Sequence, residues 1–151
     1  MSKARVLKYL LPAFAALILA QPAMAERQNP YNVMAHSAWS AFQCSVLAEK
    51  ARNMSEQKRL FEFGYDQGMK FIKALESGTA KKEELANTAP ISMLLLQGPT
   101  PDFALGRIFE AALRSALEDV FTSAAAYDSE AVQESMATRE FWKRNCSLVG
   151  K

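Results

Sequence analysis

The sequence predicts an all-α protein. Apolar side chains recur at helical spacing along most of the chain, and no stretch shows sustained alternation of apolar and polar residues. Val, Ile and Thr, which favour strands, are sparse. We expect one compact domain of about five helices at residues 26–151, preceded by a removable segment at residues 1–25.

The first 25 residues have the three-part layout of a secretory signal peptide. A basic head at residues 3–8 is followed by an apolar run at residues 10–20 and by small side chains at Ala23 and Ala25. The apolar run is shorter than the roughly 20 residues that span a bilayer. We expect cleavage before Glu26 and a mature protein in the periplasm or secreted. A retained N-terminal anchor is the alternative.

Removal of this segment changes the charge of the chain. The full sequence carries 18 Lys and Arg against 16 Asp and Glu, a net charge of +2. Three of the basic residues lie in the signal segment, which leaves 15 basic against 16 acidic side chains. The mature chain therefore gives no reason to expect nucleic acid or anionic lipid as a partner, and we expect it not to be inserted in a membrane.

Cys44 and Cys146 are the two cysteines of the chain. In an exported protein such a pair predicts one disulfide bond, here between the first and the last predicted helix. Two free buried thiols are the alternative.

The first helix is expected to begin at residues 29–32 and to end near Arg52. Its apolar stripe follows the i, i+3, i+7, i+8 pattern of one helix face. This stripe comprises Trp39, Phe42, Val46 and Leu47.

Ser55 is expected to cap a second helix, which Gly78 ends. Gly64 and Gly68 lie inside this helix on its apolar face, where each costs about 1 kcal/mol relative to Ala. We interpret them as helix-packing positions, with a ligand-facing notch as the alternative. The core side is expected to comprise Leu60, Phe61, Gly64, Gly68, Phe71, Ile72 and Leu75.

Two short elements are expected next. Thr79 is expected to cap a helix over about residues 80–87, and Pro90 opens the apolar stretch 91–97. Residues 93–96 would cover all sides of a helix, which favours burial over an interaction surface.

Thr100, Pro101 and Asp102 form a strong start signal for a long helix that is expected to reach about Ala126. Its inward side chains are expected to be Leu105, Phe109, Ala112, Leu113, Ala116, Val120 and Ala124. Its solvated face is expected to carry Arg107, Glu110, Arg114 and Glu118.

Asp128 or Ser129 is expected to cap the last helix. The final residues of the chain are expected to fray. This last helix is expected to carry the apolar side chains Val132, Met136, Trp142 and Cys146.

Motifs for catalysis or cofactor binding are missing from the sequence. His36 is the single histidine, no glycine-rich phosphate loop occurs, and no zinc or nucleophile-elbow motif is present. Paired carboxylates of the glycosidase kind stay open as a minor alternative. We expect no enzymatic activity, no cofactor and no metal, and we interpret His36 as an exposed residue.

The order of the predicted helices and motifs resembles that of a known protein family. Cys44 is followed by a GYxxG motif at residues 64–68, by a short helix over residues 79–85, by an apolar stretch that ends in Pro, and by a long helix over residues 103–121. This layout, which covers about residues 44–121, resembles the small secreted immunity proteins that protect bacteria from type VI secretion amidase toxins. Further cysteines that are usual in that family are missing here, so the disulfide scheme differs.

The resemblance implies a periplasmic, all-helical, non-enzymatic protein that blocks a cell-wall hydrolase by occluding its active site. We expect stoichiometric binding to another periplasmic protein, with a homodimer as a further option. The alternatives are a structural or accessory protein of the cell envelope, a phage-type lysis regulator, a cryptic enzyme and a carrier of a small apolar ligand.

The loop before the long helix is the candidate partner-binding segment. Its prolines pre-organise a helix N-terminus whose free N–H groups can receive a partner carboxylate. A rigid helix start without further role is the alternative. The segment comprises Gly98, Pro99, Thr100, Pro101, Asp102 and Phe103.

The first prediction concerns export. Protein recovered from the periplasm should begin at Glu26, because Ala23 and Ala25 supply the small residues that the signal peptidase requires. Intact-mass spectrometry measures this directly. A dominant species that retains residues 1–25 would contradict cleavage and favour the anchor.

Overall fold

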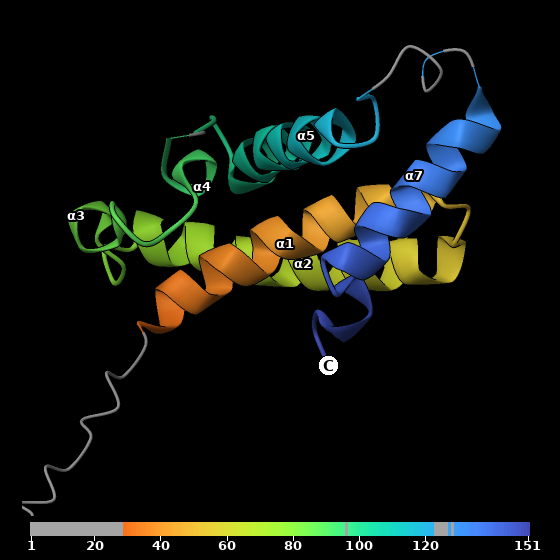
Figure 1. Ribbon diagram of the computed structural model, residues 1–151. Coiled ribbons are helices and arrows are strands. Elements are labelled where there is room, and N and C mark those ends of the chain that lie inside the picture. Colours follow the sequence, from red (N-terminus) through yellow and green to blue (C-terminus); the bar gives the residue numbers. More distant parts are fainter. Residues whose placement is uncertain (1–28, 96, 123–126, 128) are drawn as a thin grey trace, which may run out of the picture.

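The computed structural model describes residues 29–95, 97–122, 127 and 129–151, and within these residues it contains helices and no β-strand. The four long helices are α1 (Pro30–Lys50), α2 (Met54–Glu76), α5 (Pro101–Glu118) and α7 (Glu130–Lys143) (Figure 1). The short ones are α3 (Lys82–Leu85), α4 (Ile91–Leu95) and the 3-10 helix η1 (Cys146–Leu148). The predicted all-α class is confirmed. The predicted signal segment lies outside the described residues.

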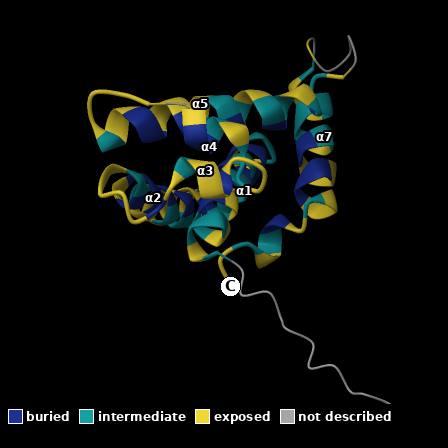
Figure 2. Cartoon of the chain, turned by 90° about the vertical axis from the view of Figure 1, so that its left-hand side faces the viewer, coloured by how far each residue is buried: buried dark blue, intermediate teal, exposed yellow. Residues whose placement is uncertain are grey.

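α1 is the central helix of the domain. It contacts α2, α5 and α7, and Figure 2 shows α2 and α7 on opposite sides of it with α5 above. The sequence analysis predicted a single apolar stripe on this helix. In the structure a larger part of α1 is buried, because α2, α5 and α7 cover several of its sides. Its buried residues are Ala35, Ala38, Ala41, Phe42, Cys44, Ser45, Val46, Leu47 and Ala48.

The start of α1 follows from its sequence. The side chain of Asn29 accepts a hydrogen bond from the Tyr31 backbone N–H, and Pro30 occupies the first turn. After α1 ends, Arg52 adopts a left-handed conformation with φ of 57°, and the Asn53 N–H donates to the carbonyl of Ala48. This backbone arrangement satisfies carbonyls at the end of α1 and turns the chain into α2.

The cap of α2 differs from the sequence prediction. Asn53, and not Ser55, is the N-cap, because its side-chain oxygen accepts from the Glu56 N–H. Ser55 instead lies within the first turn, and its hydroxyl donates to the same Asn53 oxygen. Asn is among the strongest capping residues, so it takes the position two residues earlier. The helix ends at Glu76, and Gly78 follows with a φ of +73°, which glycine tolerates.

Two predictions about the short elements were wrong. Thr79 does not cap α3; its hydroxyl donates to the carbonyl of Ala74 near the end of α2, and α3 begins at Lys82. α4 is buried on one side only: Met93 and Leu94 are buried, whereas Ile91 and Leu95 are exposed. α4 packs against α5 and the core with the side that carries Met93 and Leu94, and its other side is exposed. Residue 96 lies outside the described residues.

α5 begins as predicted and ends earlier. The Thr100 hydroxyl accepts from the Phe103 N–H, and Pro101 and Asp102 form the first turn. The helix ends at Glu118, so it does not reach Ala126; residues 123–126, including Ala124, lie outside the described residues. The buried face comprises Ala104, Leu105, Ile108, Ala112 and Ala116. Phe109 and Leu113 are only half-buried.

Ser129 caps α7, and the predicted alternative cap at position 128 lies outside the described residues. Trp142 does not face the core: its exposed fraction is 63%, because the adjacent Phe141 occupies the inward position. Glu140 is also buried, and its carboxylate is paired with Lys143 at 3.0 Å and with Arg139 at 3.4 Å. A buried carboxylate requires such partners.

α7 ends at Lys143, so the prediction that the last helix carries Cys146 was wrong. Residues 146–148 form η1, and the Arg59 guanidinium of α2 donates to the Val149 carbonyl at 2.6 Å. The same guanidinium pairs with Glu56 at 2.7 Å. Its hydrogen bond to Glu56 lowers the pKa of that carboxyl below its usual value and raises the pKa of Arg59. One side chain thus ties the end of the chain to α2.

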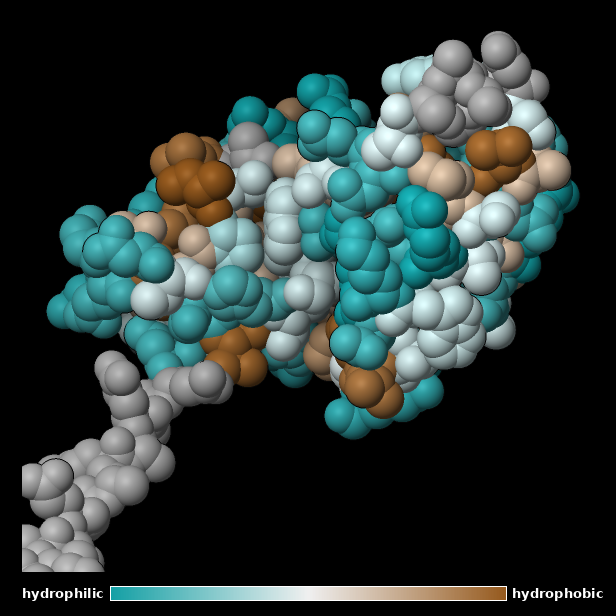
Figure 3. Space-filling view, in the orientation of Figure 1, coloured by the Kyte–Doolittle hydropathy of each residue, from teal (hydrophilic) through white to brown (hydrophobic). Residues whose placement is uncertain are grey.

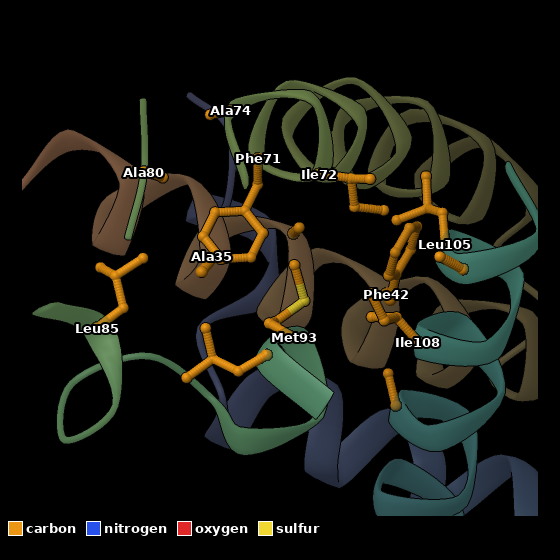
Figure 4. Close-up of a cluster of buried hydrophobic side chains, with 14 residues drawn as sticks. Ala35, Phe42, Phe71, Ile72, Ala74, Ala80, Leu85, Met93, Leu105 and Ile108 are labelled. Carbon is orange, nitrogen blue, oxygen red and sulfur yellow. The ribbon is translucent and has the colours of Figure 1, made fainter. Parts of the chain in front are cut away.

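The core consists of two clusters. One lies among α1, α2, α4 and α5 and includes Phe42, Phe71, Met93 and Ile108 (Figure 4). The other contains Leu47 of α1, Leu60 of α2 and Phe141 of α7. The second cluster surrounds a buried disulfide bond.

The predicted disulfide is confirmed. Cys44 and Cys146 are bonded across a sequence separation of 102, with Cα atoms 5.4 Å apart. Both residues are buried, and the bond joins α1 to η1. In the chain-entropy model a loop of this size contributes about 4.7 kcal/mol, before any strain in the native state.

Gly64 and Gly68 are buried at the contacts of α2 with its neighbours. A Cβ atom on Gly64 would lie 2.8 Å from a ring carbon of Phe42 and 3.2 Å from the Cβ of Ala41. A Cβ atom on Gly68 would collide with the Leu105 side chain of α5. Neighbouring side chains therefore fill the space that both glycines leave, which agrees with packing positions and not with a ligand-facing notch.

The second prediction concerns these glycines. Gly64→Ala should lower the free energy of unfolding by roughly 1–3 kcal/mol, because the rigid and buried Phe42 ring has to move. Gly106→Ala is the matched control. No atom lies within 4 Å of a Cβ at this exposed α5 position, so Ala should raise stability by about 0.5–1 kcal/mol. Denaturant unfolding measures both. Equal effects of the two substitutions would contradict the packing role of Gly64.

Candidate functional site

The predicted partner-binding segment forms the turn that leads into α5. Gly98, Pro99, Thr100, Asp102 and Phe103 are exposed, and Pro101 is half-buried. The Phe103 ring lies against Gly98, where a Cβ atom would collide with it. The Arg107 guanidinium donates to the carbonyl of Gln97. These contacts give the segment a fixed shape, which sequence reasoning attributed to its prolines alone.

The side chain of Asp102 is bonded to α2. The Tyr65 hydroxyl donates to Oδ1 of Asp102 at 2.5 Å, although 37 residues separate them in sequence. The hydrogen bond is the main cause that raises the pKa of Tyr65 above its usual value, and the negative charge of Asp102 adds to the effect. The hydrogen bond holds Oδ1 of the carboxylate in a fixed position.

Aromatic rings adjoin this hydrogen bond. The Phe61 ring lies 6.4 Å from the Tyr65 ring and 5.5 Å from the Phe109 ring, the latter in edge-to-face geometry. The buried Phe42 ring packs edge-to-face below, 5.3 Å from Phe109. Phe61 and Tyr65 are 37% and 42% exposed. Sequence analysis placed Phe61 and Phe109 in the core, whereas both reach the surface where α2 and α5 meet.

Gly106 lies one helical turn after Asp102, on the exposed side of α5. With Phe103, Arg107, Glu110, Ala111 and Arg114 it lines a shallow open depression of about 460 Å³. We use the name α2–α5 face for these residues of the two helices together; the depression itself has neither Tyr65 nor Asp102 in its lining. The α2–α5 face comprises Phe61, Tyr65, Asp102, Phe103, Gly106 and Phe109.

Charged residues border the α2–α5 face as ion pairs within single helices. The pairs are Lys58–Glu62, Asp66–Lys70 and Glu110–Arg114. The predicted solvated face of α5 agrees with this picture, since Arg107, Glu110, Arg114 and Glu118 are all exposed. Asp102 differs from these acids, because among the described residues no Lys or Arg forms an ion pair with it.

The single histidine, His36, lies in α1. His36 is exposed, and its Nε2 lies 2.5 Å from the carbonyl oxygen of Thr88. Within the described part of the chain, no group of three or more His, Cys, Asp or Glu side chains is placed to hold a metal ion. None of the described helices is long and apolar enough to cross a membrane.

A second hollow lies between α2, α4 and α5. Its volume is about 250 Å³, and its apolar lining includes Ile72, Leu75, Met93 and Leu94. Pockets for drug-sized ligands usually measure about 300–1,000 Å³. The hollow is therefore small for a carrier of an apolar ligand.

Comparisons with protein-family models, with curated proteins and with solved structures found no significant match.

The third prediction concerns the Tyr65–Asp102 bond. Asp102→Asn should lower the pKa of Tyr65 towards the usual value of 10.0, because the substitution removes the carboxylate that accepts the bond. Because the folded pKa of Tyr65 is raised, its contribution to stability is present below pH 10.0 and is lost as the pH rises through the folded pKa. Ultraviolet titration measures the ionisation, with Tyr65→Phe to assign it.

Asp66→Asn is the control for this titration. Asp66 is the next residue along α2 and pairs with Lys70 instead of Tyr65. Its substitution should leave the Tyr65 pKa almost unchanged. Equal shifts in both variants would show that net charge, and not the hydrogen bond, sets the pKa.

Proposed function

We propose that the mature chain, residues 26–151, is an exported periplasmic protein of the immunity or inhibitor kind, which neutralises a cell-wall hydrolase by stoichiometric binding. The α2–α5 face is the observation that carries this proposal. Protein interfaces are enriched in aromatic residues at their centre and have a polar rim. The α2–α5 face combines four aromatic side chains with bordering ion pairs.

The rigidity of the α2–α5 face supports this proposal. Phe61 and Phe109 pack on the buried Phe42, and the Tyr65–Asp102 bond connects α2 to α5. A surface that is ordered before binding loses little conformational entropy when a partner docks. The expected signal peptide supports the proposed compartment, and the resemblance to secreted immunity proteins supports the proposed class of partner.

A structural or accessory role in the cell envelope is the second candidate. Large apolar side chains are also exposed away from the α2–α5 face, notably Ile91, Leu95 and Leu148. Figure 3 shows one hydrophobic area over α4 and another beside the C-terminus, with hydrophilic surface between them. A protein that joins several partners in one complex needs such separate surfaces.

The fourth prediction tests the proposed function. Purified protein titrated into a panel of cell-wall amidases, endopeptidases and glycosidases should inhibit one of them at a 1:1 ratio, measured by release of peptidoglycan fragments. Phe103→Ala should weaken inhibition at least about tenfold, since exposed aromatic anchors supply much of the energy of an interface.

Trp142→Ala is the matched control, because Trp142 is an exposed aromatic residue of α7, on the other side of α1 from α2 (Figure 2). It should leave inhibition unchanged. Hydrolytic turnover by the purified chain itself, abolished by one acidic substitution, would overturn the proposal. Equal losses in both variants would move the interface away from the α2–α5 face.

A further inference from the structure

The exposed side of α5 has the residue spacing of a helix-packing face. Figure 1 shows α5 at the edge of the domain, with α1 and α2 on one side of it. On its exposed side, the residues that line the open depression follow one another at intervals of three and four, as neighbours on one face of a helix do. They are Phe103, Gly106, Arg107, Glu110, Ala111 and Arg114.

Gly106 allows another backbone to approach this face closely. Gly64, Gly68 and Gly98 all face atoms that a Cβ would approach within 3 Å, whereas nothing lies within 4 Å of a Cβ at Gly106. A glycine inside a helix is unfavourable relative to Ala, and no contact of the described chain compensates for it at this position. The distance between two packed helices depends on the side chains at their contact, so a glycine there permits a short one.

The charges of this face complement themselves when the face is reversed. Two copies of α5 that pack antiparallel, about a two-fold axis midway between residues 108 and 109, bring Arg107 of each copy opposite Glu110 of the other. Among the described residues no carboxylate pairs with Arg107, and its guanidinium has donors left beside the one that binds the carbonyl of Gln97. Glu110 binds Arg114 through Oε1, which leaves Oε2 for the second copy.

The remaining residues of the face also match under this rotation. Gly106 of each copy lies opposite Ala111 of the other, so small residues meet where the helices cross. The exposed Phe103 of each copy lies opposite Arg114 of the other, where a guanidinium can stack on the ring. Every helix face maps onto itself when it is reversed. What is particular to this chain is that a cation then meets an anion, a small residue a small one, and an aromatic ring a guanidinium.

We propose that the chain forms a symmetric dimer in which two α5 helices pack antiparallel through this face. The six residues that line the face are fewer than the roughly 20–30 that each side of a standard interface contributes, so the dimer is weak and exchanges with monomer. This inference goes beyond the proposed function. The dimer covers Phe103 and Gly106, which also belong to the α2–α5 face, so a hydrolase that binds there competes with the second copy.

Sedimentation equilibrium of the purified protein tests the dimer. The average mass should rise with protein concentration from that of a monomer towards that of a dimer. Arg107→Glu and Glu110→Arg each place like charges opposite each other, so each should weaken self-association at least about tenfold. An equimolar mixture of the two variants should associate again, because one then presents only acidic and the other only basic side chains at these positions.

Lys58→Glu and Glu62→Arg are the matched control pair. Lys58 and Glu62 form an exposed ion pair within α2, outside the α5 face, and their substitution changes the net charge by the same amounts. Each of these variants should self-associate as the unchanged protein does. Their mixture should show no gain, which separates contact across the α5 face from general attraction between oppositely charged proteins.

Gly106→Leu tests the close approach of the helices. The substitution has room within the chain, since a Cβ meets no atom there, so the fold should persist while self-association weakens at least about tenfold. Unchanged association of this variant would overturn the inference. A monomeric mass up to about 1 mM protein would also overturn it, as would a mixture of the α5 variants that associates no better than the mixture of the α2 variants.

Discussion

The close contact between α1 and α2 determines where the rest of the molecule lies. Gly64 leaves room for the Phe42 ring of α1, and this ring packs against Phe61 of α2 and Phe109 of α5. A larger residue at position 64 would displace Phe42, which is 1% exposed. The same contact that buries Phe42 therefore holds the aromatic rings above it at the surface, so the core and the candidate site share one support.

The other end of the domain depends on a covalent bond. The disulfide joins Cys44 in the middle of α1 to Cys146 after α7, and Arg59 binds the carbonyl of Val149 nearby. A contribution of about 4.7 kcal/mol is close to the whole net stability of many small domains, which is about 5–15 kcal/mol. The crosslink thus suits a domain of this size, whose hydrophobic core alone has little surplus.

The α2–α5 face includes residues that lie outside the segment 98–103, which the sequence analysis proposed as the candidate site. The loop before α5 carries the exposed Phe103, but the carboxylate of Asp102 is held by Tyr65, a residue of another helix. The hydrogen bond orients Asp102, whereas the acids Asp66 and Glu110 pair with cations of their own helices.

The sequence by itself determined the helical class, the disulfide pairing and several helix starts. Apolar periodicity, capping residues and the pairing of two cysteines are local or compositional signals, so Asn29, Thr100 and Ser129 were recognisable as caps or helix starts. Local signals failed where two caps competed, as at Asn53 and Ser55. They also failed at Trp142, because only the packing of α7 on α1 decides whether position 141 or 142 faces inward. The Tyr65–Asp102 bond was likewise beyond the sequence, because it joins residues of two helices whose relative position is set by the fit of Gly64 and Gly68 against their neighbours.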